Sequence, residues 1–269
     1  TICRLPGPPG TLRDGRRRKH NPWKRTAGGS RKYRTEKGRK EMEEKGMSYC
    51  VAIDGPAGAG KSTIAKKIAK KMQLIYVDTG AMYRAMALFL LRNHVSPEDA
   101  AAIERTCEDA EIGICYEKGQ QVVYLNGENV NDLLRSEEVG KMASISSQIK
   151  SVRRKLVDLQ RRLAETTDVI MDGRDIGTCV LPDADVKIYL TASSRVRAQR
   201  RFDELQEKGI ACNFDEIEKD IIERDRRDMT REESPLKKAE DAIEVDTSDM
   251  SIEQVIATII RICEEKKEK

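Results

Sequence analysis

A glycine-rich loop between an apolar run and an amphipathic segment is the feature that most constrains the fold of this chain. Residues 49–54 form a short apolar run, which is typical of a buried parallel strand. Residues 64–72 place apolar side chains on one helical face and lysines on the other. The loop between them matches the pattern GxxxxGK(S/T) without gaps. Strand, loop and helix in this order predict a phosphate-binding P-loop rather than an ordinary glycine-rich turn.

The residue types of this loop suit nucleotide phosphates. Glycines such as Gly55 and Gly60 let backbone N–H groups turn toward phosphate oxygens, and the start of the following helix adds positive potential. The Lys61 ammonium can reach the β- and γ-phosphates, and the Ser62 hydroxyl can face Mg²⁺. P-loops occur in GTPases, ATPases and several classes of kinase, so the loop alone leaves the substrate open. The GTPase motif NKxD is absent from the chain, which counts against that class.

Four further apolar runs predict strands, at 74–77, 169–171, 186–190 and 242–245. They alternate with helical segments, and the last run is followed by a predicted cap at 246–248 and a helix over 252–263. This alternation predicts an α/β fold with a parallel sheet that helices cover on both faces. Ligands lie at the carboxyl ends of the strands in such sheets, so the polar residues that follow each strand are candidates for a binding site.

Residues 111–125 break this alternation. The runs 111–116 and 121–125 flank a short polar turn, which is the pattern of a β-hairpin. We therefore predict a small antiparallel piece inserted into the parallel fold.

Two arginine-rich segments follow the fourth strand of the core. The first gathers arginines over residues 195–201, on one predicted helix. In the second, Arg224, Asp228 and Arg231 stand at i, i+4 and i+7, so that one helical face can carry all three. A solvated charged helix is the alternative interpretation, and it is the usual explanation of a charge run.

The first 46 residues carry the excess of positive charge. This segment has 15 lysines and arginines against 5 acidic residues, whereas residues 47–269 have a net charge of −6. Its composition and its lack of apolar periodicity predict disorder. Two interpretations of this segment are a basic arm for nucleic acid, with Trp23 and Tyr33 for stacking, and a solvated extension without function. We favour a third interpretation, that residues 1–46 are not native and that translation starts at Met47.

The remaining composition argues against several classes of protein. The longest apolar run, residues 85–91, is far too short to cross a bilayer, so we expect no membrane association. Seven cysteines are scattered without a CxxC pair, and only two histidines are present. These counts argue against a zinc site and against a histidine-based catalytic triad. They fit a reducing compartment, and we expect a cytoplasmic protein.

Several longer motifs stand in a fixed order along the chain. They are IDGPAGAGKST, YVDTGAMYRA, DGRDIGT, LPDADVKIYLTAS and ERDRRDMTR. From residue 48 onward, about four fifths of the chain resembles the bacterial cytidylate kinases of the nucleoside monophosphate kinase family. The resemblance implies a P-loop kinase domain over 47–269, in which helices cover a parallel sheet. It also implies a monophosphate-binding region at about 79–166, an antiparallel insertion at about 105–145 and an arginine-bearing lid at about 193–232.

The resemblance implies direct transfer of the γ-phosphoryl group of ATP to CMP or dCMP, with Mg²⁺ as the cofactor. The residues implied to bind ATP form the whole loop, Gly55, Pro56, Ala57, Gly58, Ala59, Gly60, Lys61, Ser62 and Thr63, with Ser62 facing Mg²⁺. Those implied to bind CMP are Asp78, Thr79, Tyr83, Arg84, Ser144, Arg153, Arg174, Asp175, Arg224, Asp228 and Arg231. The implied catalytic residues are Lys61, Arg174, Arg197, Arg200 and Arg201. We expect a monomer whose partners are these nucleotides, with nucleic acid contacted at most through the basic segment.

The chemistry of this reaction agrees with the residue types. The second pKa of a phosphate is about 6, so the acceptor is largely a dianion at neutral pH and needs no general base. Arginines and Mg²⁺ would offset the repulsion between the two nucleotides. A carboxylate such as that of Asp228 accepts a hydrogen bond from the cytosine amine and repels uracil O4, so UMP should be a poor acceptor.

Three other functions stay open from the sequence. The first is another P-loop phosphotransferase, such as a thymidylate, adenylate or shikimate kinase. The second is a nucleic-acid-binding switch that uses the basic segment, against which the acidic remainder of the chain argues. The third is a nucleotide-binding regulator without turnover.

Overall fold

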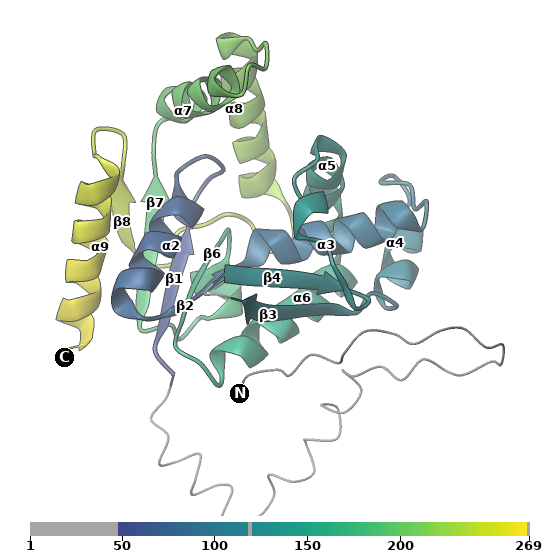
Figure 1. Ribbon diagram of the computed structural model, residues 1–269, viewed down its shortest axis with the longest axis horizontal. Coiled ribbons are helices and arrows are strands. Elements are labelled where there is room, and N and C mark those ends of the chain that lie inside the picture. The colour runs from purple at the N-terminus through teal and green to yellow at the C-terminus, as the bar shows by residue number, and fades with distance from the viewer. Residues whose placement is uncertain (1–47, 118–119, 268–269) are drawn as a thin grey trace, which may run out of the picture. The chain divides into compact units, whose positions relative to one another are not determined.

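The computed structural model describes residues 48–117 and 120–267. The basic segment and the expected start at Met47 lie outside these residues, so the interpretations of that segment stay predictions. The described chain contains a five-stranded parallel sheet in the order β2–β6–β1–β7–β8, with helices packed against it (Figure 1). Its strands are β1 (Cys50–Asp54), β2 (Ile75–Asp78), β6 (Val169–Gly173), β7 (Val186–Thr191) and β8 (Ile243–Asp246). Each predicted strand is present within two residues of its expected ends, and the predicted α/β fold is confirmed.

Each face of this sheet carries its own apolar cluster. Along β1 the side chains alternate, so that Val51 and Ile53 are buried on one face and Ala52 on the other. Burying a side chain the size of Ile53 contributes roughly 1.5–3 kcal/mol to folding. Two helices cover each face, α2 (Lys61–Met72) and α9 (Ile252–Lys267) on the first and α3 (Thr79–Arg92) and α6 (Lys150–Ala164) on the second. The sheet is therefore a firmly packed platform for the segments at its carboxyl edge.

A separate three-stranded antiparallel sheet interrupts the parallel fold. It consists of β3 (Ile112–Glu117), β4 (Gln120–Leu125) and β5 (Glu128–Asn129). The predicted hairpin is therefore confirmed, with Tyr116 directly opposite Gln121 in its register. The flanking elements are α4 (Ala100–Cys107), η3 (Asn131–Leu133) and α5 (Glu137–Ser146).

The two arginine-rich segments form α7 (Ser194–Glu207) and α8 (Phe214–Thr230), which lie at the top of Figure 1. Asn213 begins α8 by accepting a hydrogen bond from the Asp215 amide at 2.9 Å, as an N-cap does. The helix ends at Thr230, and Arg231 has an extended backbone with φ −62° and ψ 142°. The prediction that Arg224, Asp228 and Arg231 share one helical face is therefore wrong for Arg231.

A π-helical turn, η4 (Ile176–Val180), follows β6 and completes the elements around the carboxyl edge. None of the helices within residues 48–117 and 120–267 is long and apolar enough to cross a membrane.

Candidate active site

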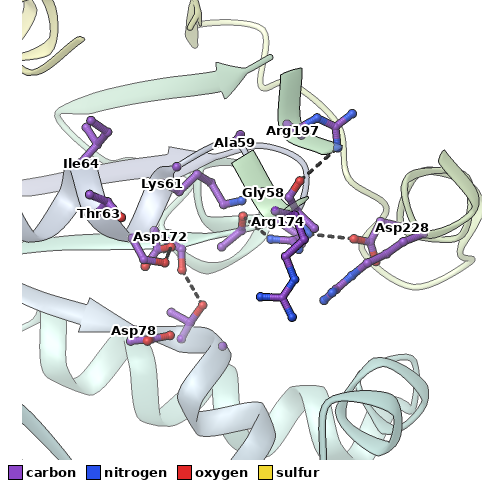
Figure 2. A pocket seen from close by; sticks show the side chains of 18 of the residues that line it. Gly58, Ala59, Lys61, Thr63, Ile64, Asp78, Asp172, Arg174, Arg197 and Asp228 are labelled. Carbon is purple, nitrogen blue, oxygen red and sulfur yellow. Dashed lines mark hydrogen bonds and ion pairs between the residues drawn. The ribbon is translucent and has the colours of Figure 1, made fainter. Parts of the chain in front are cut away.

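A cleft of about 760 Å³ opens at the carboxyl edge of the parallel sheet. Its walls are the glycine-rich loop with the start of α2, the segments after β2, β6 and β8, and the inner sides of α5, α6, α7 and α8. Figure 2 shows Lys61, Asp172 and Arg174 close together in this cleft. The predicted site residues that line it are Ala57, Gly58, Ala59, Gly60, Lys61, Ser62, Thr63, Asp78, Thr79, Tyr83, Arg84, Ser144, Arg153, Arg174, Asp175, Arg197, Arg200, Arg201, Arg224, Asp228 and Arg231. Only Gly55 and Pro56, of those predicted, do not line it, and the role of each residue stays a prediction.

The glycine-rich loop needs glycine for steric reasons. Gly55 has φ +148°, and a Cβ atom there would lie 1.9 Å from the Leu190 carbonyl oxygen. Gly60, which precedes α2, has φ +88°, a left-handed conformation that favours glycine. The Lys61 ammonium folds back over the loop and donates to the carbonyl oxygens of Gly55 and Pro56, at 2.7 and 2.6 Å. Burial, followed by the charge of Arg174, holds the pKa of Lys61 well below its ordinary value. An anion bound in the cleft would raise the pKa of Lys61 toward its ordinary value.

Asp172, at the end of β6, connects the loop to β2. Its carboxylate accepts hydrogen bonds from the Ser62 hydroxyl and from the Tyr76 hydroxyl, each at 2.8 Å. Burial, and then the charge of Asp78, raises the pKa of Asp172. A serine hydroxyl beside a buried carboxylate is a hard oxygen donor set, and a divalent cation there would relieve the repulsion between the two carboxylates. Sequence reasoning named Ser62 and missed Asp172, although Asp172 opens the DGRD motif.

Asp54, at the end of β1, was also missed. Its two carboxylate oxygens accept from the backbone amides of Ile176 and Gly177, both at 2.7 Å. Burial raises the pKa of Asp54 to about 6, against the effect of these two hydrogen bonds. Asp54 therefore anchors the η4 turn to the strand that leads into the loop.

The side of the cleft formed by α3 and α6 contains two buried donors without acceptors. The Tyr83 hydroxyl and Arg231 Nη2 make no hydrogen bond with any described residue. Arg153 lies over the Tyr83 ring, at 5.8 Å from its centre, and forms an ion pair with Asp175. Arg231 Nη2 is 3.8 Å from the same carboxylate. Burial raises the pKa of Tyr83 to about 12, so its hydroxyl keeps its proton and acts as a donor. Buried donors of this kind are costly unless a ligand supplies the acceptors.

Asp228 lies on α8 and also lines the cleft. Its carboxylate accepts from Arg174 Nε at 2.8 Å (Figure 2). Burial by itself would raise the pKa of Asp228, but Arg174, Arg224 and Arg231 outweigh it and lower the pKa. The carboxylate therefore stays ionised at neutral pH and can only accept hydrogen bonds.

The arginines of α7 are held by protein groups. Arg197, whose side chain is 5% exposed, donates to the Ala192 and Ala57 carbonyls at 2.9 and 3.0 Å. It also forms a two-pronged ion pair with Asp225, at 3.1 and 2.6 Å. Arg200 donates to the hydroxyl and the carbonyl of Thr247, at 3.2 and 2.8 Å. Arg201 pairs with Glu204 at 2.8 Å on the surface. Asp225 was missed because a charge in the middle of a charged helix resembles a solvated one.

The pair formed by Arg197 and Asp225 joins α7, α8 and the glycine-rich loop, so we expect Asp225→Ala to lower the free energy of unfolding by about 3 kcal/mol. The loss arises because the variant leaves a buried guanidinium without its counter-ion. Urea denaturation followed by circular dichroism measures the change. Glu223→Ala is the matched control, since Glu223 lies on the same helix and pairs with Arg226 in solvent. Equal losses in the two variants would contradict this role of the buried pair.

Two sequence comparisons with known proteins agree on one family. The sequence model of the family described as "Cytidylate kinase" matches residues 51–265. The cytidylate kinase of Lactobacillus gasseri is 51% identical over 84% of this chain and 99% of that protein. The cytidylate kinase of Halalkalibacterium halodurans is 47% identical over 80% of this chain and 97% of its own length. Among solved structures, a shikimate kinase from Bacteroides thetaiotaomicron aligns with 80% of this chain and 98% of that chain, at 14% identity and a TM-score of 0.42.

Proposed function

Since this chain belongs to the cytidylate kinase family, we propose which part of the cleft binds ATP and which part binds the acceptor nucleotide. The enzyme transfers the γ-phosphoryl group of ATP to CMP, which gives CDP and ADP. In our proposal the glycine-rich loop holds the phosphates of ATP, and the α3, α6 and α8 side of the cleft holds the acceptor. We assign monophosphate binding to about 79–166, with its insertion at about 105–145, and the function of a lid to about 193–232.

Two buried donors support the position of the acceptor phosphate. The Tyr83 hydroxyl and Arg231 Nη2 have no acceptor among the described residues, although both line the cleft. A phosphate of CMP would supply oxygen acceptors and also neutralise the nearby guanidinium groups. In this arrangement Arg174 and Arg153 contribute to phosphate binding, while Asp175 meets the ribose.

The base is read by Arg224 and Asp228 in our proposal. Because the Asp228 carboxylate stays ionised, it accepts from the N4 amine of cytosine and repels O4 of uracil. The same contacts suit cytosine with either sugar, so both CMP and dCMP are proposed as acceptors. Asp78, Thr79, Arg84 and Ser144 are the remaining proposed contacts of the acceptor.

The chemical step requires electrostatic stabilisation more than proton transfer. The acceptor phosphate, with a second pKa of about 6, is largely a dianion and attacks the γ-phosphorus of ATP directly, in line with the leaving oxygen. Lys61 is the buried cation of the loop and stabilises the charge of the transferring group. The arginines proposed to share this work are Arg174, Arg197, Arg200 and Arg201. For Arg197 this requires an exchange of its contacts with Asp225 and the loop.

A kinase of this family that uses ATP needs a divalent metal ion. We propose Mg²⁺, held by the Ser62 hydroxyl and the Asp172 carboxylate together with ATP. The oxygen donor set and the raised pKa of the buried Asp172 support a cation at this place. When bound, such an ion neutralises phosphate charge. We further propose that the enzyme acts as a monomer in the cytoplasm.

Affinities for CMP and for cytidine test the assignment of the phosphate site. We expect calorimetry to show CMP binding at least about 100-fold more tightly than cytidine, because the phosphate alone satisfies the two buried donors. Tyr83→Phe should weaken CMP binding about tenfold and leave cytidine binding unchanged. Equal affinities of the wild-type protein for the two ligands would refute the assignment.

A further inference from the structure

Strand β2 is an edge strand of the parallel sheet, and among the described residues β6 is its only neighbour in that sheet. The Ile75 amide faces β6 and donates to the Asp168 carbonyl at 2.9 Å. In a parallel ladder, alternate residues of a strand direct their backbone groups to opposite sides. The backbone groups of Tyr76 and Asp78 therefore point outward, where a bare sheet edge would leave them without partners.

Side chains of the antiparallel sheet occupy this outer edge. The Gln121 amide forms two hydrogen bonds with Asp78, since its Oε1 accepts from the backbone amide at 2.8 Å and its Nε2 donates to the carbonyl at 3.2 Å. The Tyr116 hydroxyl donates to the Tyr76 carbonyl at 3.0 Å. Gln121 thus meets the edge as a neighbouring strand would, with one donor and one acceptor.

Tyr116 and Gln121 are held in place by the antiparallel sheet to which they belong. Tyr116 and Gln121 face each other in the register of β3 and β4, so their side chains lie on one face of the hairpin. Asn131 fixes the other side of β4, because its Nδ2 donates to the Gln121 carbonyl at 3.1 Å and its Oδ1 accepts from the Val123 amide at 2.9 Å. The hairpin therefore presents a preorganised pair of polar groups to β2.

Tyr76 and Asp78, whose backbone groups bind the hairpin, are also connected to the cleft, since Tyr76 contacts Asp172 and Asp78 lines the cleft itself. The Asp78 side chain begins α3 by accepting from the Ala81 amide at 2.9 Å. The Tyr76 hydroxyl donates to Asp172 at 2.8 Å, and the Thr79 hydroxyl donates to the Asp172 carbonyl at 2.7 Å. A shift of the end of β2 would therefore move the start of α3, where the acceptor is proposed to bind.

We propose that Gln121 and Tyr116 are positioning residues for phosphoryl transfer, which dock the antiparallel sheet on the edge of β2 and hold Asp78 in place for the acceptor nucleotide. This inference rests on the proposed function. Neither side chain lines the cleft, so both act through the backbone of β2 rather than on the substrate.

Steady-state kinetics of the full chain test this role. We expect Gln121→Ala to raise the KM for CMP about tenfold, because it removes both hydrogen bonds from Asp78, and to leave the KM for ATP within about twofold. Tyr116→Phe, which removes one hydrogen bond, should raise the KM for CMP about threefold. Tyr124→Phe is the matched control on the same hairpin, since the Tyr124 hydroxyl donates to Glu117 at 3.0 Å and not to β2. Its KM values should equal those of the wild-type enzyme.

Hydrogen exchange at the Asp78 amide gives a readout that does not depend on activity. Exchange should quicken at least about tenfold in Gln121→Ala and stay unchanged in Tyr116→Phe and Tyr124→Phe, because only the first removes the acceptor of this amide. Equal KM values for CMP in Gln121→Ala and Tyr124→Phe would overturn the inference, as would an equal rise of both KM values. In both of those outcomes the wild-type enzyme still turns over CMP, so the proposed function stands. A wild-type enzyme that does not turn over CMP would refute the proposed function itself.

Discussion

An Asp228→Asn variant is expected to lose about 10³-fold of the preference for CMP over UMP, measured as the ratio of the two kcat/KM values. The ionised carboxylate offers acceptors alone, which suits the cytosine amine and opposes uracil O4. An asparagine amide has both a donor and an acceptor and can turn either one toward the base. The preference for CMP should therefore fall because kcat/KM decreases for CMP and increases for UMP.

Asp220→Asn is the control for this substitution. Asp220 lies on the same helix, is exposed, and does not line the cleft. The same chemical change there should leave both kcat/KM values as they are in the wild-type enzyme. An unchanged preference in Asp228→Asn would remove Asp228 from the reading of the base.

A Lys61→Met variant is expected to lose at least about 10³-fold in kcat, with the affinity for CMP changed by less than about threefold. Lys61 is the buried ammonium of the loop, and methionine keeps much of its apolar length without the charge. The loss should appear in the chemical step, because the charge on the transferring group grows there. Single-turnover kinetics with saturating ATP and CMP measure this step.

Lys70→Met removes a lysine from the exposed side of the same helix and serves as the control, with wild-type kcat expected. Comparable turnover in Lys61→Met and Lys70→Met would contradict a catalytic role for Lys61. Loss of CMP binding in Lys61→Met, measured by calorimetry, would instead place Lys61 in the acceptor site.

Local patterns were enough to predict the architecture. The strands were predictable because each is a short apolar run with polar residues at its ends, and the hairpin because two such runs flank a polar turn. Ends of elements were less predictable. The cap expected at 246–248 is wrong, since Ser251 and Gln254 exchange side-chain to backbone hydrogen bonds at the start of α9.

The structural roles of Asp54, Asp172 and Asp225 could not be predicted from the sequence. Asp54 and Asp172 close apolar strands, but the partners of their carboxylates lie 96 to 123 positions away, in segments that only the fold brings close. Asp225 has the same residue type as its solvated neighbours, and only its pairing with Arg197 distinguishes it. The sequence does not indicate the contact of Gln121 with β2, because a polar residue in a hairpin is ordinarily taken as solvent-facing. The motifs and the family resemblance therefore predicted residues that line the cleft, whereas the groups that position them depend on tertiary contacts.

The most direct measurement is ADP release by the full chain with ATP and Mg²⁺ and, in turn, CMP, dCMP, UMP, AMP, dTMP and shikimate. We predict turnover with CMP and dCMP, weak turnover with UMP, and loss of activity when the metal is chelated. Turnover with shikimate or dTMP in preference to CMP would contradict the acceptor site described above. Absence of CMP turnover from a folded protein would contradict its function as a kinase of cytidine monophosphates.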